Sequence, residues 1–168
     1  PAPEDRWVPG LRLGHTMGEK ERDCMIEPDT IKLLRECDAG IKMGVASIDE
    51  VLGYTQSDKL RQRLADCKSE HEKLQRETER LLEEYHDDGK NPSPMAKGMS
   101  WIKTNAKLAM DNSDAAIAEL MTDGCNMGVK SLNRYLNQYQ AADEVTKDIT
   151  KRLIHLEEDL TEDIRPFL

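Results

Sequence analysis

The sequence predicts an all-α protein built from long amphipathic helices. Apolar residues recur at alternating steps of three and four along most of the chain, the period of helices that bury one face. Trp 2, Tyr 4 and Phe 1 make only 7 aromatic residues among 168, and Val and Ile are sparse. Because sandwiches and barrels draw on aromatic and β-branched residues, an all-β fold is disfavoured. The length fits one domain.

The first long helix is expected over residues 28–53. Pro28 suits a first helical turn, where its missing N–H is not needed, and Gly53 ends the helix. The buried seam steps 3, 4, 3, 4, 3, 4 and consists of Ile31, Leu34, Asp38, Ile41, Val45, Ile48 and Leu52.

The second long helix is expected over residues 57–87, with Ser57 as its N-cap. Its seam is Leu60, Leu64, Cys67, His71, Leu74, Thr78, Leu81 and Tyr85. A run of Asp, Gly, Asn and Pro ends it before residue 93. Short linkers make consecutive helices antiparallel neighbours, so the first two helices should form a hairpin.

Three further helices are expected: a short one over about 94–110, then long ones over 113–140 and 143–166. The third long seam is Ile117, Met121, Cys125, Gly128, Leu132, Tyr135 and Tyr139, and the fourth is Ile149, Leu153, Leu156, Leu160 and Phe167. Glycine destabilises a helix interior by up to ~1 kcal/mol, so Gly124 and Gly128 need a reason. We expect close packing, against Trp101 or the face of Met95 and Met99.

Residues 1–26 hold three of the seven prolines and show no helical period. We expect an extended or disordered arm, with residues 27–168 forming the bundle. Two interpretations stay open for its start: a native arm, or a chain that begins at Met17, in which case residues 1–16 are not native. A native arm would dock its apolar residues on its own surface or a partner's; these are Trp7, Val8, Leu11 and Leu13.

The charge balance of 24 basic against 33 acidic residues gives −9, which argues against binding to nucleic acid. No apolar run approaches the ~20 residues of a membrane span. The spacing of the four cysteines, Cys24, Cys37, Cys67 and Cys125, fits no zinc motif, and we expect reduced thiols. A cytoplasmic protein without membrane contact is the expectation.

The order of the expected helices and linkers resembles that of a known group of proteins. A helical hairpin is followed by Ser-Pro-Met-Ala-Lys-Gly-Met-Ser-Trp at residues 93–101, and then by a second hairpin. That hairpin contains Ile117-Ala-Glu-Leu-Met-Thr-Asp-Gly-Cys-Asn-Met-Gly and, later, Leu156-Glu157-Glu158. This arrangement resembles the bacterial ferritin-like four-helix-bundle proteins of unknown function over about residues 28–168. The resemblance implies a ferritin-like antiparallel four-helix bundle with a short crossover helix between the two hairpins.

The di-iron pattern of ferritin-like proteins needs Glu on two helices and Glu-x-x-His on the other two. Lys68 stands where Glu should precede His71, and the fourth seam turns His155 to the flank of the bundle, near Glu158 or Asp159. A di-iron centre of this type is therefore not expected.

One pair remains. Asp38 precedes Thr55, the middle of the first turn, by nearly the same sequence separation as that by which His71 follows it. Both are on seams, so we expect them at one height, as a hydrogen-bonded pair. Two interpretations stay open: a structural pair that fixes the hairpin register, or a site for iron or another transition metal with Cys67 or Cys125 nearby.

The leading functional hypothesis is a non-enzymatic helical bundle that acts through protein–protein contact, as a homo-oligomer or within an assembly. No catalytic residues are identified, and no cofactor is expected. The alternative is a metal-binding ferritin-like protein, with oxidoreductase activity at a degenerate iron site formed by Asp38 and His71.

Overall fold

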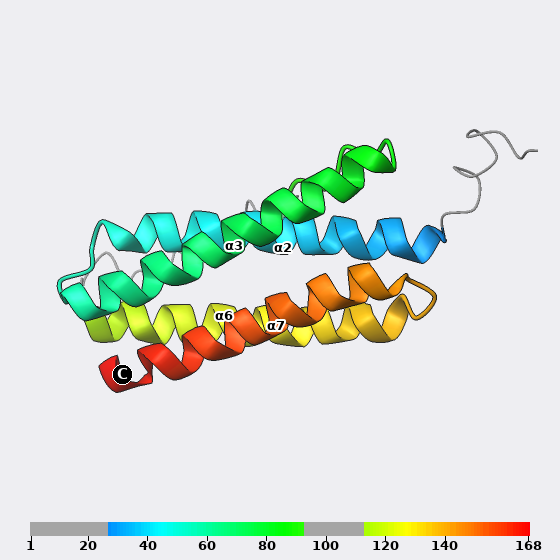
Figure 1. Ribbon diagram of the computed structural model, residues 1–168. Helices are drawn as coiled ribbons and strands as arrows, with labels where there is room; N and C mark the ends of the chain where they lie inside the picture. The colour runs from blue at the N-terminus through cyan, green and yellow to red at the C-terminus, as the bar shows by residue number, and fades with distance from the viewer. Residues whose placement is uncertain (1–26, 93–112) are drawn as a thin grey trace, which may run out of the picture.

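The computed structural model describes residues 27–92 and 113–168, which are helical throughout apart from turns and ends. The helices are α2 (Pro28–Leu52), α3 (Asp58–Glu84), α6 (Asp114–Gln138) and α7 (Glu144–Ile164), followed by the short 3-10 helix η2 (Arg165–Phe167) (Figure 1). These two stretches contain no strand, so the predicted all-α class is confirmed for them. The expected arm over 1–26 and the short helix over 94–110 lie outside the described residues.

Local capping signals set where three of these helices begin. The side chains of Ser57, Ser113 and Asp143 accept hydrogen bonds from N–H groups in the first turns of α3, α6 and α7. α2 has no side-chain cap, but Pro28 occupies its first turn, as predicted. The sequence therefore locates the helix starts to within a residue or two.

The helices pair as two hairpins, and contacts at both ends hold the hairpins together (Figure 1). At one end, the Asp114 carboxylate at the start of α6 accepts the backbone N–H groups of Gln56 and Ser57, both at 2.8 Å. At the other end, Asp29 accepts the N–H of Ala141, and the Thr30 hydroxyl accepts the N–H of Asp143. The start of α6 thus lies at the end of α2, and the end of α6 lies at its start.

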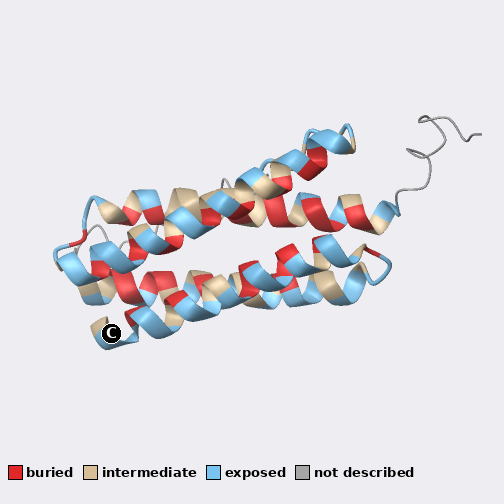
Figure 2. Ribbon diagram, in the orientation of Figure 1, coloured by how far each residue is buried: buried red, intermediate tan, exposed pale blue. Residues whose placement is uncertain are grey.

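The core forms two clusters along the length of these helices (Figure 2). One surrounds the α2–α3 turn and includes Ile48, Val51, Leu60, Leu64, Ile117, Leu160 and Ile164. The other lies at the opposite end of the bundle and includes Leu34, Ile41, Leu74, Leu81, Leu132, Ile149 and Leu153. The predicted α3 seam is buried at every position except Tyr85, which is half-buried. No helix in the described part of the chain is apolar for a long enough stretch to cross a bilayer.

We predict that Asp114→Ala destabilises the protein by ~1–3 kcal/mol, because the variant leaves two backbone N–H groups at the α2–α3 turn without their acceptor. Asp58→Ala is the matched control, since the Asp58 side chain also opens a helix but is 96% exposed. Urea unfolding of both variants checks this. Equal losses in the two would show that Asp114 acts only on its own helix terminus.

Candidate functional site

A group of polar and small residues lies about halfway along the bundle, at the edge of the core cluster that surrounds the α2–α3 turn. Each helix contributes a residue between its apolar positions, and we call the set the central polar layer. Its members are Gly44 of α2, Cys67 and His71 of α3, Cys125 and Gly128 of α6, and Glu157 of α7. A layer of polar groups in a core is costly unless its members satisfy one another.

The His71 ring lies at the centre of this layer and is 1% exposed. Its Nδ1 lies 2.9 Å from the carbonyl oxygen of Cys67, and its Nε2 lies 3.0 Å from Oε1 of Glu157. A carbonyl oxygen can only accept, so Nδ1 carries a hydrogen. A carboxylate also only accepts, so an ionised Glu157 requires a hydrogen on Nε2 as well.

The pKa of His71 gives the same protonation state. Burial acts to lower this pKa, but the contacts with Cys67 and Glu157 outweigh burial and raise the pKa from 6.5 to about 10. The ring is therefore an imidazolium at neutral pH, with both N–H groups donating. The layer holds a buried ion pair between α3 and α7.

Two interior glycines lie against this pair, and one of them makes room for it. A Cβ at Gly44 would lie 2.7 Å from Nε2 of His71, closer than real side chains approach one another. A Cβ at Gly128 would lie 3.6 Å from Cδ of Glu157, which is ordinary contact. The contact with Glu157 therefore does not require glycine at position 128, and the expected neighbours Met95, Met99 and Trp101 lie outside the described residues. Gly124 has no neighbour within 4 Å of such a Cβ.

Three thiols are described, and all are free. Sγ of Cys67 lies 3.5 Å from Nδ1 of His71. Burial, together with the charge of Glu157 and a hydrogen bond to it, raises the pKa of Cys125. Cys37 lies in the far cluster, 3.2 Å from the Thr150 hydroxyl, and burial raises its pKa to about 12. Cys67 therefore lies beside His71, and Cys125 lies beside Glu157, the other partner of the ring.

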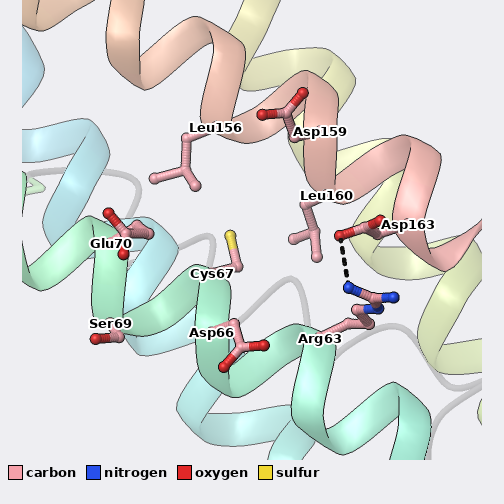
Figure 3. A pocket seen from close by; sticks show the side chains of 9 residues that line it. All are labelled: Arg63, Asp66, Cys67, Ser69, Glu70, Leu156, Asp159, Leu160 and Asp163. Carbon is pink, nitrogen blue, oxygen red and sulfur yellow. Dashed lines mark ion pairs between the residues drawn. The ribbon is translucent and has the colours of Figure 1, made fainter.

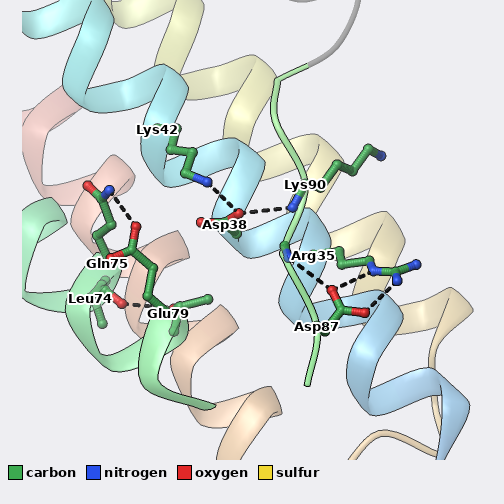
Figure 4. A network of polar contacts seen from close by, with 10 residues as sticks. Arg35, Asp38, Lys42, Leu74, Gln75, Glu79, Asp87 and Lys90 are labelled. Carbon is green, nitrogen blue, oxygen red and sulfur yellow. Dashed lines mark hydrogen bonds and ion pairs between the residues drawn. The ribbon is translucent and has the colours of Figure 1, made fainter. Parts of the chain in front are cut away.

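The predicted hydrogen bond between Asp38 and His71 is wrong. Asp38 is buried, as predicted, but its Oδ2 accepts from Nζ of Lys42 at 2.8 Å and from the backbone N–H of Lys90 at 3.0 Å (Figure 4). Gly44, not Asp38, faces the imidazole.

The path of the α2–α3 linker is the physical reason. Gly44 lies closer along the chain to the end of α2 at Leu52 than His71 lies to the start of α3 at Asp58. The linker carries the chain past the end of α2 before α3 begins (Figure 1). A turn taken as symmetric about Thr55 therefore places α3 out of register with α2.

Asp38 instead anchors the chain that follows α3. Asp87 pairs with Arg35 (Figure 4). Nζ of Lys90 lies 2.7 Å from Oε1 of Glu36. Gly89 has φ of +72°, where glycine is favoured, and a Cβ there would meet the Asp38 carboxylate. The sequence run Asp-Asp-Gly-Lys predicted only the end of a helix; its contacts with α2 were missed.

The structure does not bring Asp38 and His71 together as metal ligands. Within residues 27–92 and 113–168, no three His, Cys, Asp or Glu side chains are arranged to hold a metal ion. The central polar layer has suitable residue types, but its protons oppose metal binding: both His71 nitrogens donate hydrogen bonds, and burial favours the protonated thiol of Cys125. Metal content itself stays a prediction of the alternative hypothesis.

The position predicted for His155 is confirmed. Its side chain is 73% exposed, and its Nδ1 lies 3.3 Å from Oε2 of Glu158 on the same helix. His155 therefore lies on the flank of α7, away from the central polar layer.

A cleft of about 300 Å³ opens between α3 and α7, beside the central polar layer (Figure 3). Leu156, Leu160 and Cys67 line its apolar part. Its charged side chains are Asp66 and Glu70 from α3, Asp159 and Asp163 from α7, and one cation, Arg63, whose Nη1 lies 3.8 Å from Asp163. Four acids against one base give the lining a formal charge of −3. The sequence analysis did not predict this cleft.

Comparisons of this chain with protein-family models, with curated proteins and with solved structures find no match.

We predict that Gly44→Ala destabilises the protein by ~1–3 kcal/mol, despite alanine's higher helix propensity, because the new methyl group displaces the His71 ring. Gly124→Ala is the control: it has open space and should be neutral or stabilising by up to ~1 kcal/mol. Thermal or urea unfolding measures both. A stabilised Gly44→Ala protein would contradict the placement of His71.

We also predict that stability falls as pH rises from about 6.5 towards 10. Below pH 6.5 the imidazole is protonated in both states, so the stabilisation is fully present. Above it the unfolded chain releases the proton that the folded protein retains. The expected loss is on the order of 1 kcal/mol per pH unit.

Urea unfolding between pH 7 and 8.5 tests this, below the range in which Cys37 and Cys125 add the same trend. Glu157→Gln should flatten the slope because it removes the carboxylate partner of His71. A free energy of unfolding that is constant or rises over this window would contradict the ion pair.

Proposed function

We propose that this protein is a non-enzymatic, ferritin-like helical bundle that acts by binding a basic segment of another protein in the cleft between α3 and α7. Its fold supplies two hairpins whose facing helices, α3 and α7, form a fixed recess with acidic side chains around an apolar floor.

The positions of the helix ends support the ferritin-like part of this proposal. Near the end of α3, Tyr85 donates to Asp143 in the α6–α7 turn at 3.4 Å, whereas α6 begins beside the α2–α3 turn. The chain between α3 and α6 must therefore connect opposite ends of the bundle. One long crossover of this kind distinguishes ferritin-like bundles from bundles with short loops only.

The composition of the cleft is the observation that supports the proposed binding of a basic segment. Lysine and arginine have an apolar stem and a charged head, so they can cover Leu156 and Leu160 while reaching the carboxylates of Asp159 and Asp163. The remaining acids, Asp66 and Glu70, lie on the opposite wall, on α3. A basic, amphipathic segment matches both walls at once.

Charge also favours a basic partner over a second copy of this chain. The formal charge of −9 means that two copies repel each other, most strongly where acids are concentrated. Attraction of a basic segment raises the association rate and weakens with salt. The expected homo-oligomer stays a prediction, and its mass by light scattering would test it separately.

A pair of synthetic helical peptides tests this function: both repeat leucine at steps of three and four, and the other positions are lysine in one peptide and glutamate in the other. We expect the lysine peptide to bind, with an affinity that falls with salt, and the glutamate peptide not to bind. The double variant Asp159→Asn with Asp163→Asn should weaken binding of the lysine peptide by about tenfold, roughly 1.4 kcal/mol.

The control is Asp123→Asn with Glu83→Gln, which removes the same charge from exposed positions outside the cleft. If both double variants lose affinity equally, binding of the peptide depends only on the net charge of the protein, and the cleft is not the binding site.

A photocrosslinker at Ser69, which lines the cleft, and one at the exposed Lys130 of α6 extend the test to the protein's own cells. We expect a partner with a basic segment to be captured by the crosslinker at position 69 and not by the one at position 130. Crosslinks at 69 only to a second copy of the chain would contradict it.

A further inference from the structure

The Cys67 thiol lies where the cleft meets the central polar layer. It is one of the residues that line the cleft, and its sulfur points from α3 towards α7, between Leu156 and Leu160 (Figure 3). The other two described thiols lie in the core: Cys37 is 0% exposed and Cys125 is 2% exposed, against 6% for Cys67. Of the three, Cys67 alone is reachable through the recess.

A cation lies next to this sulfur. Nδ1 of His71 is 3.5 Å from Sγ of Cys67, and the ring is an imidazolium held in place by Glu157 at its other nitrogen. The thiolate is the form of a cysteine that attacks disulfides. Access through the cleft and a polar ring at contact distance therefore coincide at one thiol.

The walls of the cleft decide which reagents arrive. Asp66, Glu70, Asp159 and Asp163 surround the entrance, with Arg63 as its one cation among the lining residues. Their exposed carboxylates concentrate small cations near the opening and repel small anions. At the floor, Leu156 and Leu160 offer apolar contact to a short alkyl chain.

We propose that Cys67 is a thiol-modification site selective for small cationic disulfides, which carry ammonium groups on short alkyl arms. In the reaction, the Cys67 thiolate attacks one sulfur of the reagent. The Cys67–sulfur bond forms as the reagent's sulfur–sulfur bond breaks, and the second half of the reagent leaves as a thiolate that takes up a proton from water. The products are a mixed disulfide at Cys67 and one free thiol.

Three disulfides of matched length separate charge from size. Cystamine carries two positive charges, bis(2-hydroxyethyl) disulfide is neutral, and 3,3′-dithiodipropionate carries two negative charges. The protein is the full chain with Cys24→Ser, because Cys24 lies outside the described residues. Peptide mapping by mass spectrometry reports which cysteine is modified and how fast.

We expect Cys67 to be modified well before Cys37 and Cys125 by all three reagents. Cystamine should react at least about tenfold faster than the anionic disulfide at low salt, and high salt should reduce this ratio. Asp159→Asn with Asp163→Asn should also reduce the ratio, whereas Asp123→Asn with Glu83→Gln should leave it unchanged.

Two results would overturn the inference. One is modification of Cys67 only together with Cys37 and Cys125, which would show that all three react through unfolding. The other is a ratio near one between the cationic and anionic reagents in the Cys24→Ser protein. The test uses no protein partner, so its outcome is independent of the proposed peptide binding.

Discussion

The buried ion pair between His71 and Glu157 is the constraint on which the middle of this bundle depends. Breaking a buried pair by removing one partner typically costs ~3–5 kcal/mol, since the other charge is left without compensation. The pair holds α3 against α7 at one height, because His71 is almost fully enclosed and its second nitrogen is committed to the Cys67 carbonyl. The space that the ring occupies requires glycine at position 44. The apolar core forms two clusters, one towards each end of the bundle.

The same pair connects the core to the surface. His71 donates to the backbone carbonyl of Cys67, one helical turn earlier, and that residue's sulfur lines the cleft. The charge that stabilises the interior is thus adjacent to the floor of the acidic recess. A change at Glu157 would act on the protonation of the ring, which contacts the Cys67 sulfur. The ion pair and the cleft are one continuous arrangement of groups from α3 and α7.

Periodicity predicted the helices and most of their buried faces, because local rules control both. Ser57, Pro28 and the α3 seam needed no knowledge of partners, and His155 followed from the direction of its own seam. Partners across helices were not predictable in this way. The error at Asp38 came from the linker, whose path shifts α3 along α2 and replaces Asp38 by Gly44 opposite His71.

Glu157 was missed because it lies one position beyond Leu156 on a seam that reads as apolar. A signal did exist: Gly44 and Gly128 are interior glycines on two helices, and each lies against a polar side chain from another helix. No sequence pattern of this kind indicates the cleft, because its walls come from α3 and α7, which are far apart in the sequence. Acids at i,i+4 spacings on exposed helix faces look the same whether or not a recess lies between them.

The protonation state of the His71 ring tests the central claim most directly. Nitrogen-15 NMR of the histidine side chains at pH 8 distinguishes an imidazolium from either neutral tautomer, and comparison with His71→Gln assigns the signal. The buried ion pair predicts hydrogens on both Nδ1 and Nε2 at this pH, as expected for a pKa of about 10. A ring with one bare nitrogen at pH 8 would make the imidazole neutral and contradict the account.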